Sequence, residues 1–351
     1  MREWQREREH GTKAGAFSRL WGISRSTHWR WVKGRWKEER KRVKRISEYV
    51  RRQVIEIDRR YRSTWDVHAI AHIVGISPTT VAKILLEVRG PRPKRTKHPH
   101  TRRTRFIRRD VMWSSDFVRL VGGWMLVKTM DEMSGYRLGW DLVRSENAEQ
   151  ALAHAQSIAA RMGRVPLVWK YDHGSAFTSA MFQKFLAERM IVPYPTQPRA
   201  PWTNGRVERD HQEIHNWLIP LEGKTVSEEE IEKEIDGGMW MLNFIKPRAC
   251  LGFRKSAETY FEDEAGGLEN ADDEIRGMFQ QAIDDAKTEL GCADSLDPNQ
   301  LKKKSGERLH RKAVRIVMQR WKLYEEWDTA EPEGTPEDKI VNRSAASNVS
   351  F

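Results

Sequence analysis

Three acidic side chains stand apart from the other carboxylates of the sequence because of the residues around them. Asp116 lies in VMWSSDFVRL, an apolar stretch typical of a central strand, where a carboxylate is costly unless a cation or hydrogen bonds compensate it. Asp172 ends the strand-like LVWKYD, and Glu208 lies near the start of a predicted helix over 204–218. Active sites of α/β folds lie at strand ends and helix starts, and carboxylates are the hard ligands that Mg²⁺ prefers. The three acids are therefore candidates for metal chemistry.

The spacing of these acids and the residues beside them resemble one family. Between the first and second acids lie 55 residues, and between the second and third lie 35. The flanking sequences are WSSDF, YDHGSAFTS and PWTNGRVERDHQEI, and NFIKPRACLGFRKSAETYF follows them. This arrangement resembles the catalytic core of DDE-class insertion-sequence transposases and retroviral integrases over about residues 105–265. Three acids at a chosen spacing are a weak signal, whereas three with matching flanks in the same order are specific.

The resemblance implies a fold, a cofactor and a reaction. The fold is an RNase H-like α/β domain, a mixed five-stranded sheet with helices on both faces. Asp116, Asp172 and Glu208 would hold two Mg²⁺ ions, for which Mn²⁺ would substitute, and Asp116 would bridge them. The cations offset the repulsion of three converging carboxylates, activate an attacking water or 3′-hydroxyl and stabilise the leaving oxygen. The expected enzyme is a polynucleotidyl transferase that cuts a transposon end and joins it to target DNA without a covalent protein intermediate.

Several polar residues near the triad depart from the family pattern. His173 stands where the family usually has Asn after the second Asp, a position that is not a direct ligand. Gln212 and His215 follow Glu208 by four and seven residues, where retroviral integrases place DNA-contacting lysines, so both are candidate DNA contacts. His211 and His215 are interpreted as surface histidines rather than as metal ligands.

Other acids compete for the catalytic roles. Asp131 lies in the turn-like DEMSG and is attributed to turn chemistry, whereas Asp110 precedes a strand and is expected at the surface. Asp210 and Glu213 share the predicted helix with Glu208 but are rotated away from its face. None of the four is assigned to the site.

Charge is sorted along the chain. Residues 1–110 hold 31 Lys and Arg against 11 Asp and Glu, whereas the remainder holds 31 basic and 39 acidic residues. A strongly cationic third joined to a mildly acidic body indicates a polyanionic partner, for which nucleic acid is the first candidate.

Two short repeats in the basic region predict helix-turn-helix modules. Gly-Ile-Ser occurs at 22–24 and again at 75–77, each time between helical stretches. In the second copy, a small residue before the turn and two apolar residues after it have the required spacing, with Ser77 as N-cap and Pro78 as first helical residue. In the first copy, His28 takes a position that is usually apolar. An ordinary helical hairpin is the alternative for either copy. The candidate DNA contacts are Arg25, Ser26, Thr27, Arg30, Thr79, Thr80 and Lys83, with Arg92, Lys94 and Arg95 in the basic arm.

The pattern along the chain predicts six segments. In the helical C-terminal region, the basic stretch 301–323 is either a second DNA-contacting helix or a solvated basic face. The segments are helix-turn-helix modules over 1–45 and 46–90, a basic linker arm over 91–109, the catalytic core over 110–265, a helical C-terminal region over 266–328 and a disordered tail over 329–351.

Composition excludes several classes of protein. No apolar run approaches the ~20 residues of a membrane span, and two cysteines exclude a disulfide framework. No G-x-x-x-x-G-K-[ST] motif of an ATPase is found. The leading interpretation is a cytoplasmic, nucleoid-associated DNA transposase that acts as a homodimer or larger oligomer on DNA, with an accessory transposition protein as a further candidate partner. The alternatives are a DNA-binding regulator with an inactive core and a metal-dependent nuclease.

Overall fold

The computed structural model divides the chain into two compact units, with the boundary between residues 52 and 53. It describes parts of 6–29, together with 46–90, 102–197, 205–262, 273–293 and 303–328. The predicted tail over 329–351 lies outside the described residues, as do six candidate DNA contacts: Arg25, Thr27, Arg30, Arg92, Lys94 and Arg95.

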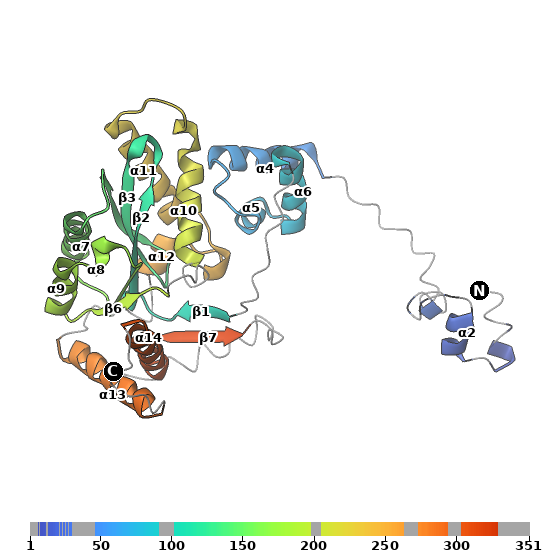
Figure 1. The fold of residues 1–351 in the computed structure, drawn as a ribbon. Coiled ribbons are helices and arrows are strands. Elements are labelled where there is room, and N and C mark those ends of the chain that lie inside the picture. The colour runs from blue at the N-terminus through green and yellow to red at the C-terminus, as the bar shows by residue number, and fades with distance from the viewer. Residues whose placement is uncertain are drawn as a thin grey trace. The chain divides into compact units, whose positions relative to one another are not determined.

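A mixed five-stranded sheet forms the centre of the second unit (Figure 1). The strand order is β4-β3-β2-β5-β6, so β2, which carries Asp116, is the middle strand. Its pairing with β3, and that of β3 with β4, is antiparallel, whereas β2–β5 and β5–β6 are parallel. The expected sheet is thereby confirmed. The strands are β2 (Met112–Arg119), β3 (Met125–Asp131), β4 (Arg137–Val143), β5 (Val168–Tyr171) and β6 (Val192–Pro195).

Helices cover both faces of this sheet (Figure 1). On one face, Trp113 and Trp169 pack with buried residues of α7 and α9. On the other face, Leu126 packs with Ile214 of α10 and Ile235 of α11. The period of two along each strand sends alternate side chains to these two layers. The helices are α7 (Ala148–Met162), α8 (Ser175–Thr178), α9 (Ala180–Glu188), α10 (Gly205–Leu218), α11 (Glu228–Trp240) and α12 (Ser256–Phe261), with single turns η2 (Val121–Gly123), η4 (Ile219–Leu221) and η6 (Ala249–Leu251) and the π-helix η5 (Met241–Ile245).

The second Gly-Ile-Ser copy lies between two helices that meet at a sharp angle. Gly75 adopts φ 72° after α5, and the Ser77 side chain accepts a hydrogen bond from the backbone N–H of Thr80, with Pro78 as the first helical residue. The predicted cap and turn are confirmed. The axes of the two helices are bent by 115° relative to each other. Within the described ranges, no single helix is long and apolar enough to cross a membrane, and this bent pair meets the criteria of length and composition alone. The module comprises α4 (Glu48–Arg60), α5 (Val67–Val74) and α6 (Pro78–Arg89).

The first copy follows α2 (Ala14–Leu20) in the first unit. His28, at the position that is usually apolar, is buried there, and its Nδ1 lies 3.0 Å from Ser18 Oγ. Its ring also lies 5.2 Å from that of Phe17. A hydrogen-bonded histidine therefore takes the place of an apolar core residue.

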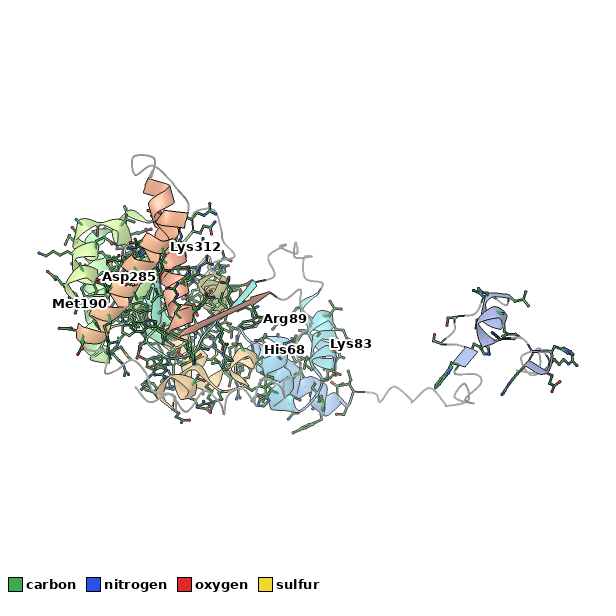
Figure 2. The ribbon with its side chains drawn as sticks, turned by 90° about the horizontal axis from the view of Figure 1, so that it is seen from below. His68, Lys83, Arg89, Met190, Asp285 and Lys312 are labelled. Carbon is green, nitrogen blue, oxygen red and sulfur yellow. The ribbon has the colours of Figure 1, made fainter. Side chains whose placement is uncertain are left out.

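The C-terminal region packs on the sheet and adds a strand that the sequence did not predict. The antiparallel ladder pairs Phe106 of β1 with Tyr324 of β7. Phe279 of α13 and Val317 of α14 share a core cluster with Leu167, which precedes β5. Figure 2 labels Asp285 on α13 and Lys312 on α14. The basic linker arm expected over 91–109 therefore includes a strand in its last part. The elements are β1 (Arg102–Phe106), α13 (Asp273–Ala293), α14 (Lys303–Arg320) and β7 (Tyr324–Asp328).

Two buried aspartates, Asp110 and Asp131, lie beside the loop between β3 and β4, and the backbone N–H of Asp110 donates a hydrogen bond to Asp131 Oδ1. Asp131 Oδ2 accepts hydrogen bonds from the backbone N–H and the hydroxyl of Ser134, which confirms its predicted turn role. The surface assignment of Asp110 is wrong, because its Oδ1 accepts hydrogen bonds from Trp113 Nε1 and from the hydroxyl of Tyr260 on α12. Burial, and then the charge of Asp110, raise the pKa of Asp131 to about 7.

The raised pKa of Asp131 predicts a pH-dependent stability. Its pKa rises from 3.8 to about 7 on folding, so the native state binds a proton that the unfolded chain has lost. The stabilisation of the folded state by protonated Asp131 is complete below the pKa of the unfolded chain. It is lost as the pH rises through the pKa of the folded protein. Between these limits, the unfolding free energy of the wild type should fall relative to Asp131→Asn by about 1.4 kcal/mol per pH unit. Urea unfolding of both proteins across this range measures the slope, and parallel curves would contradict the assignment.

Candidate active site

The register of two parallel strands brings Asp116 and Asp172 to the same edge of the sheet. In the β2–β5 ladder, Met112 pairs with Val168 and Ser114 with Lys170. Two residues further along each strand are Asp116 and Asp172. Asp116, within β2, and Asp172, directly after β5, are therefore neighbours beside the carboxyl end of β5, where open α/β sheets bind ligands.

The two carboxylates influence each other electrostatically. Burial, and next the charge of Asp172, raise the pKa of Asp116 to about 7. Lys128, which pairs with Asp116 on the neighbouring strand β3, lowers it. The side chain of Asp116 is 14% exposed. Asp116 Oδ1 accepts a hydrogen bond from the backbone N–H of Phe117, and Asp172 Oδ1 accepts one from Gly174, both at 2.9 Å. Each aspartate therefore has one oxygen held by the backbone.

The third predicted acid is not gathered with the first two. Glu208 is exposed near the start of α10. Among the residues that the structure describes, no three His, Cys, Asp or Glu side chains are arranged to hold one metal ion. The assignment of Glu208 as the third metal ligand stays a prediction.

His211 lies beside Asp116 rather than at the surface. Its Nε2 is 3.5 Å from Asp116 Oδ2, and its side chain is 26% exposed. That nitrogen is buried and has no hydrogen-bond partner among the described residues. Burial, and then the charge of Lys128, lower the pKa of His211 to about 3, so the ring is neutral. The interpretation of His211 as a surface histidine is wrong, because α10 turns this side chain towards the sheet.

Glu146, between β4 and α7, is a further acid of this edge that the sequence did not predict. A Cβ atom built on Gly174 would collide with Glu146 Oε1 and would lie 2.9 Å from Asp172 Oδ1. Burial and the charge of Asp172 raise the pKa of Glu146. In RSENAEQ it precedes a predicted helix, a position equally typical of a surface acid, so only the tertiary structure identifies it.

The space over Gly174 predicts a sensitive position. Gly174→Ala would push its methyl group against the carboxylates of Glu146 and Asp172. Because displacing a reacting group by about 1 Å can cost about 100-fold in rate, we expect the proposed metal-dependent DNA cleavage to fall by up to that order without loss of the fold. Gly237→Ala is the matched control, because its Cβ would meet only Trp217, at 3.8 Å. Equal cleavage rates for both variants would contradict this prediction.

Buried ion pairs fix α10 against the sheet. Asp210 pairs with Lys128 of β3 and Arg137 of β4, and all three side chains are at most 3% exposed. Glu213 accepts a hydrogen bond at 2.7 Å from Lys246, which also donates to the backbone oxygen of Thr64 in the helical module. The two acids thus anchor the helix that carries Glu208 and His211, which confirms that they point away from the face of Glu208.

The other predicted DNA contacts differ in their exposure. On α6, Thr79 and Lys83 are exposed and Thr80 is half-buried, and Figure 2 shows Lys83 extending from its helix. On α10, Gln212 is exposed, and His215 is 63% exposed with Nε2 3.4 Å from Glu222. Ser26 in the first unit is exposed. The accessibility of these side chains is compatible with DNA contact, which stays a prediction.

Comparison with known proteins supports the resemblance over part of the chain. Residues 108–201 match the family model of the integrase core domain, a segment that includes Asp116 and Asp172 but ends before Glu208. No curated protein matches the sequence.

Many solved structures are similar, among them three of low sequence identity. A chain of the simian T-cell lymphotropic virus intasome in complex with PP2A regulatory subunit B56 gamma is 17% identical, with TM-score 0.39, covering 59% of this chain and 74% of that one. The HTLV-2 integrase catalytic core domain in complex with magnesium is 20% identical, with TM-score 0.37 and coverages of 44% and 99%. The BIV integrase catalytic core domain is 21% identical, with TM-score 0.36 and coverages of 44% and 97%.

Proposed function

We propose that this chain is a DNA transposase of the DDE class, which cuts transposon ends and joins them to target DNA. The observation that carries the proposal is the pair Asp116 and Asp172, which are neighbours within β2 and directly after the adjacent parallel strand β5, in a segment that matches an integrase core domain. Glu208, on the helix anchored beside that edge, completes the acidic triad.

The donor atoms at this edge fit a divalent cation. Asp116 and Asp172 bring like charges together, and the buried Nε2 of His211 has no hydrogen-bond partner. Hard oxygen donors of this kind suit Mg²⁺. Two bound Mg²⁺ ions would activate the attacking water or 3′-hydroxyl and stabilise the leaving oxygen. The chain contributes the carboxylates and the helix that holds them in place.

The helical module and the basic arm bind the transposon ends in this proposal. An angle of 115° between α5 and α6 is within the range of helix-turn-helix motifs. The exposed residues Thr79 and Lys83 belong to the second helix, which such motifs place in the major groove. Because strand transfer brings two ends together, a homodimer or larger assembly on DNA is expected.

A strand-transfer assay tests the proposal against its alternatives. The full chain is incubated with Mg²⁺, labelled DNA carrying candidate end sequences from the flanks of its gene, and a target plasmid. A transposase cuts beside the end and joins the 3′-hydroxyl to the plasmid. A regulator with an inactive core binds the DNA without cutting it, and a nuclease cuts without joining. Either of the last two outcomes would overturn the proposal.

A further inference from the structure

The buried Nε2 of His211 lies beside Asp116 but makes no hydrogen bond with any described residue. It lies 3.5 Å from Asp116 Oδ2. A buried polar atom without a partner is costly and needs a physical reason. A ligand shared with Asp116 would supply one.

The 3.5 Å between the two atoms is slightly longer than the distance between two ligands of one metal ion. Donors that each lie about 2.1 Å from an ion are about 3.0 Å apart at a right angle and about 3.4 Å apart at a tetrahedral angle. Asp116 Oδ1 is held by the backbone N–H of Phe117, which leaves Oδ2 facing His211. Asp116 Oδ2 and His211 Nε2 therefore lie next to each other at this edge.

The sequence of α10 places Glu208 close to His211, although Asp116, Glu208 and His211 are not gathered around one point among the described residues. Glu208 precedes His211 by three residues, so the two side chains lie on neighbouring positions of one helix face. A Glu-x-x-His pair on one helix is a ligand pattern of di-iron and di-manganese carboxylate proteins. The ion pairs of Asp210 with Lys128 and Arg137 fix the rotation of this helix.

We propose that His211 Nε2 is a ligand of the divalent cation that Asp116 binds, which makes the site a mixed nitrogen and oxygen site. This inference rests on the proposed function, because it uses the same ion. Imidazole suits transition metals, whereas Mg²⁺ prefers oxygen ligands. The site therefore favours Mn²⁺ over Mg²⁺ more than an all-carboxylate triad does, and DNA cleavage is supported by Mn²⁺ at lower concentrations than by Mg²⁺.

Pulsed EPR of the full-length protein with Mn²⁺ alone tests the ligand directly. An imidazole bound to Mn²⁺ produces nitrogen modulation of the electron spin echo, which carboxylates and water do not. We expect this modulation in the wild type and in His215→Gln, and its loss in His211→Gln. Mn²⁺ titrations should show affinity about tenfold lower for His211→Gln, the scale at which changes around a metal site act. His215 is the matched control, because it lies one turn later on the same helix and is 63% exposed.

The outcomes separate the inference from the proposed function. If Asp116→Asn abolishes Mn²⁺ binding but the wild type shows no nitrogen modulation, His211 is not a ligand and the acidic site stands. The same conclusion follows if His211→Gln keeps the modulation. If Mn²⁺ binds equally to the wild type and Asp116→Asn, both the inference and the proposed function are wrong. The wild-type spectrum shows whether a nitrogen ligand is bound to Mn²⁺ even if a variant fails to fold.

Discussion

Strand transfer is expected to fall by at least about 10³-fold when Asp172 is replaced by Asn, the scale of losses when a group of a catalytic unit is removed. The amide keeps the shape of the side chain and can still accept the 2.9 Å hydrogen bond from Gly174 N–H. It removes the negative charge that Asp172 presents to Asp116 and to the cation. The measurement is the yield of joined product with Mg²⁺, with DNA-end binding followed separately by gel shift.

DNA binding by Asp172→Asn should be unchanged, because the proposed contacts lie on the helical module and the basic arm. Glu149→Gln, on the exposed side of α7, is the matched control and should retain joining. Full joining by Asp172→Asn would remove this residue from the catalytic assignment. Loss of joining and of DNA binding together would indicate a folding defect instead.

Asp210→Asn should lower the free energy of unfolding by about 3–5 kcal/mol, the cost of removing one partner from a buried ion pair. Lys128 and Arg137 are at most 3% exposed, and both pair with this carboxylate. Their positive charges hold the pKa of Asp210 well below its usual range against the effect of burial. The amide would leave Arg137 with Glu213, at 3.1 Å, and Lys128 with the charge of Asp116 as compensation. Urea unfolding of wild type and variant, at neutral pH without metal, gives the difference.

Glu188→Gln provides the comparison for an exposed ion pair. Glu188 lies 3.7 Å from Lys184 on α9, and both side chains are more than half exposed. Such pairs contribute about 0–1 kcal/mol, so unfolding should hardly change. A difference below about 1 kcal/mol for Asp210→Asn as well would mean that the buried pairs do not anchor α10.

Local sequence patterns predicted several elements of the core. The helix predicted over 204–218 spans Gly205–Leu218. The strand around Asp116 is central, as its apolar flanks indicated. These signals lie within a few residues of the element that they define.

Features that depend on distant contacts were not predicted. The pairing of β1 with β7 joins segments from opposite ends of the described core, and neither has a strong strand pattern of its own. His211 and Glu146 have ordinary surface contexts in the sequence, and only the packing of α10 and the β4–α7 connection brings them to Asp116 and Asp172. The proximity of Asp116 and Asp172 was inferred from the family resemblance, and its physical cause is the register of β2 and β5.

The ladder between β1 and β7 also sets an order for biosynthesis. Phe106 is made early and Tyr324 late, yet both belong to the core cluster that includes Leu167 and Val168 at the start of β5. A ribosome must therefore translate almost to residue 328 before this layer can close. Until then, the apolar side chains at the base of β5 lack their final cover, and a polypeptide stalled or truncated before α14 would expose them to chaperones and proteases.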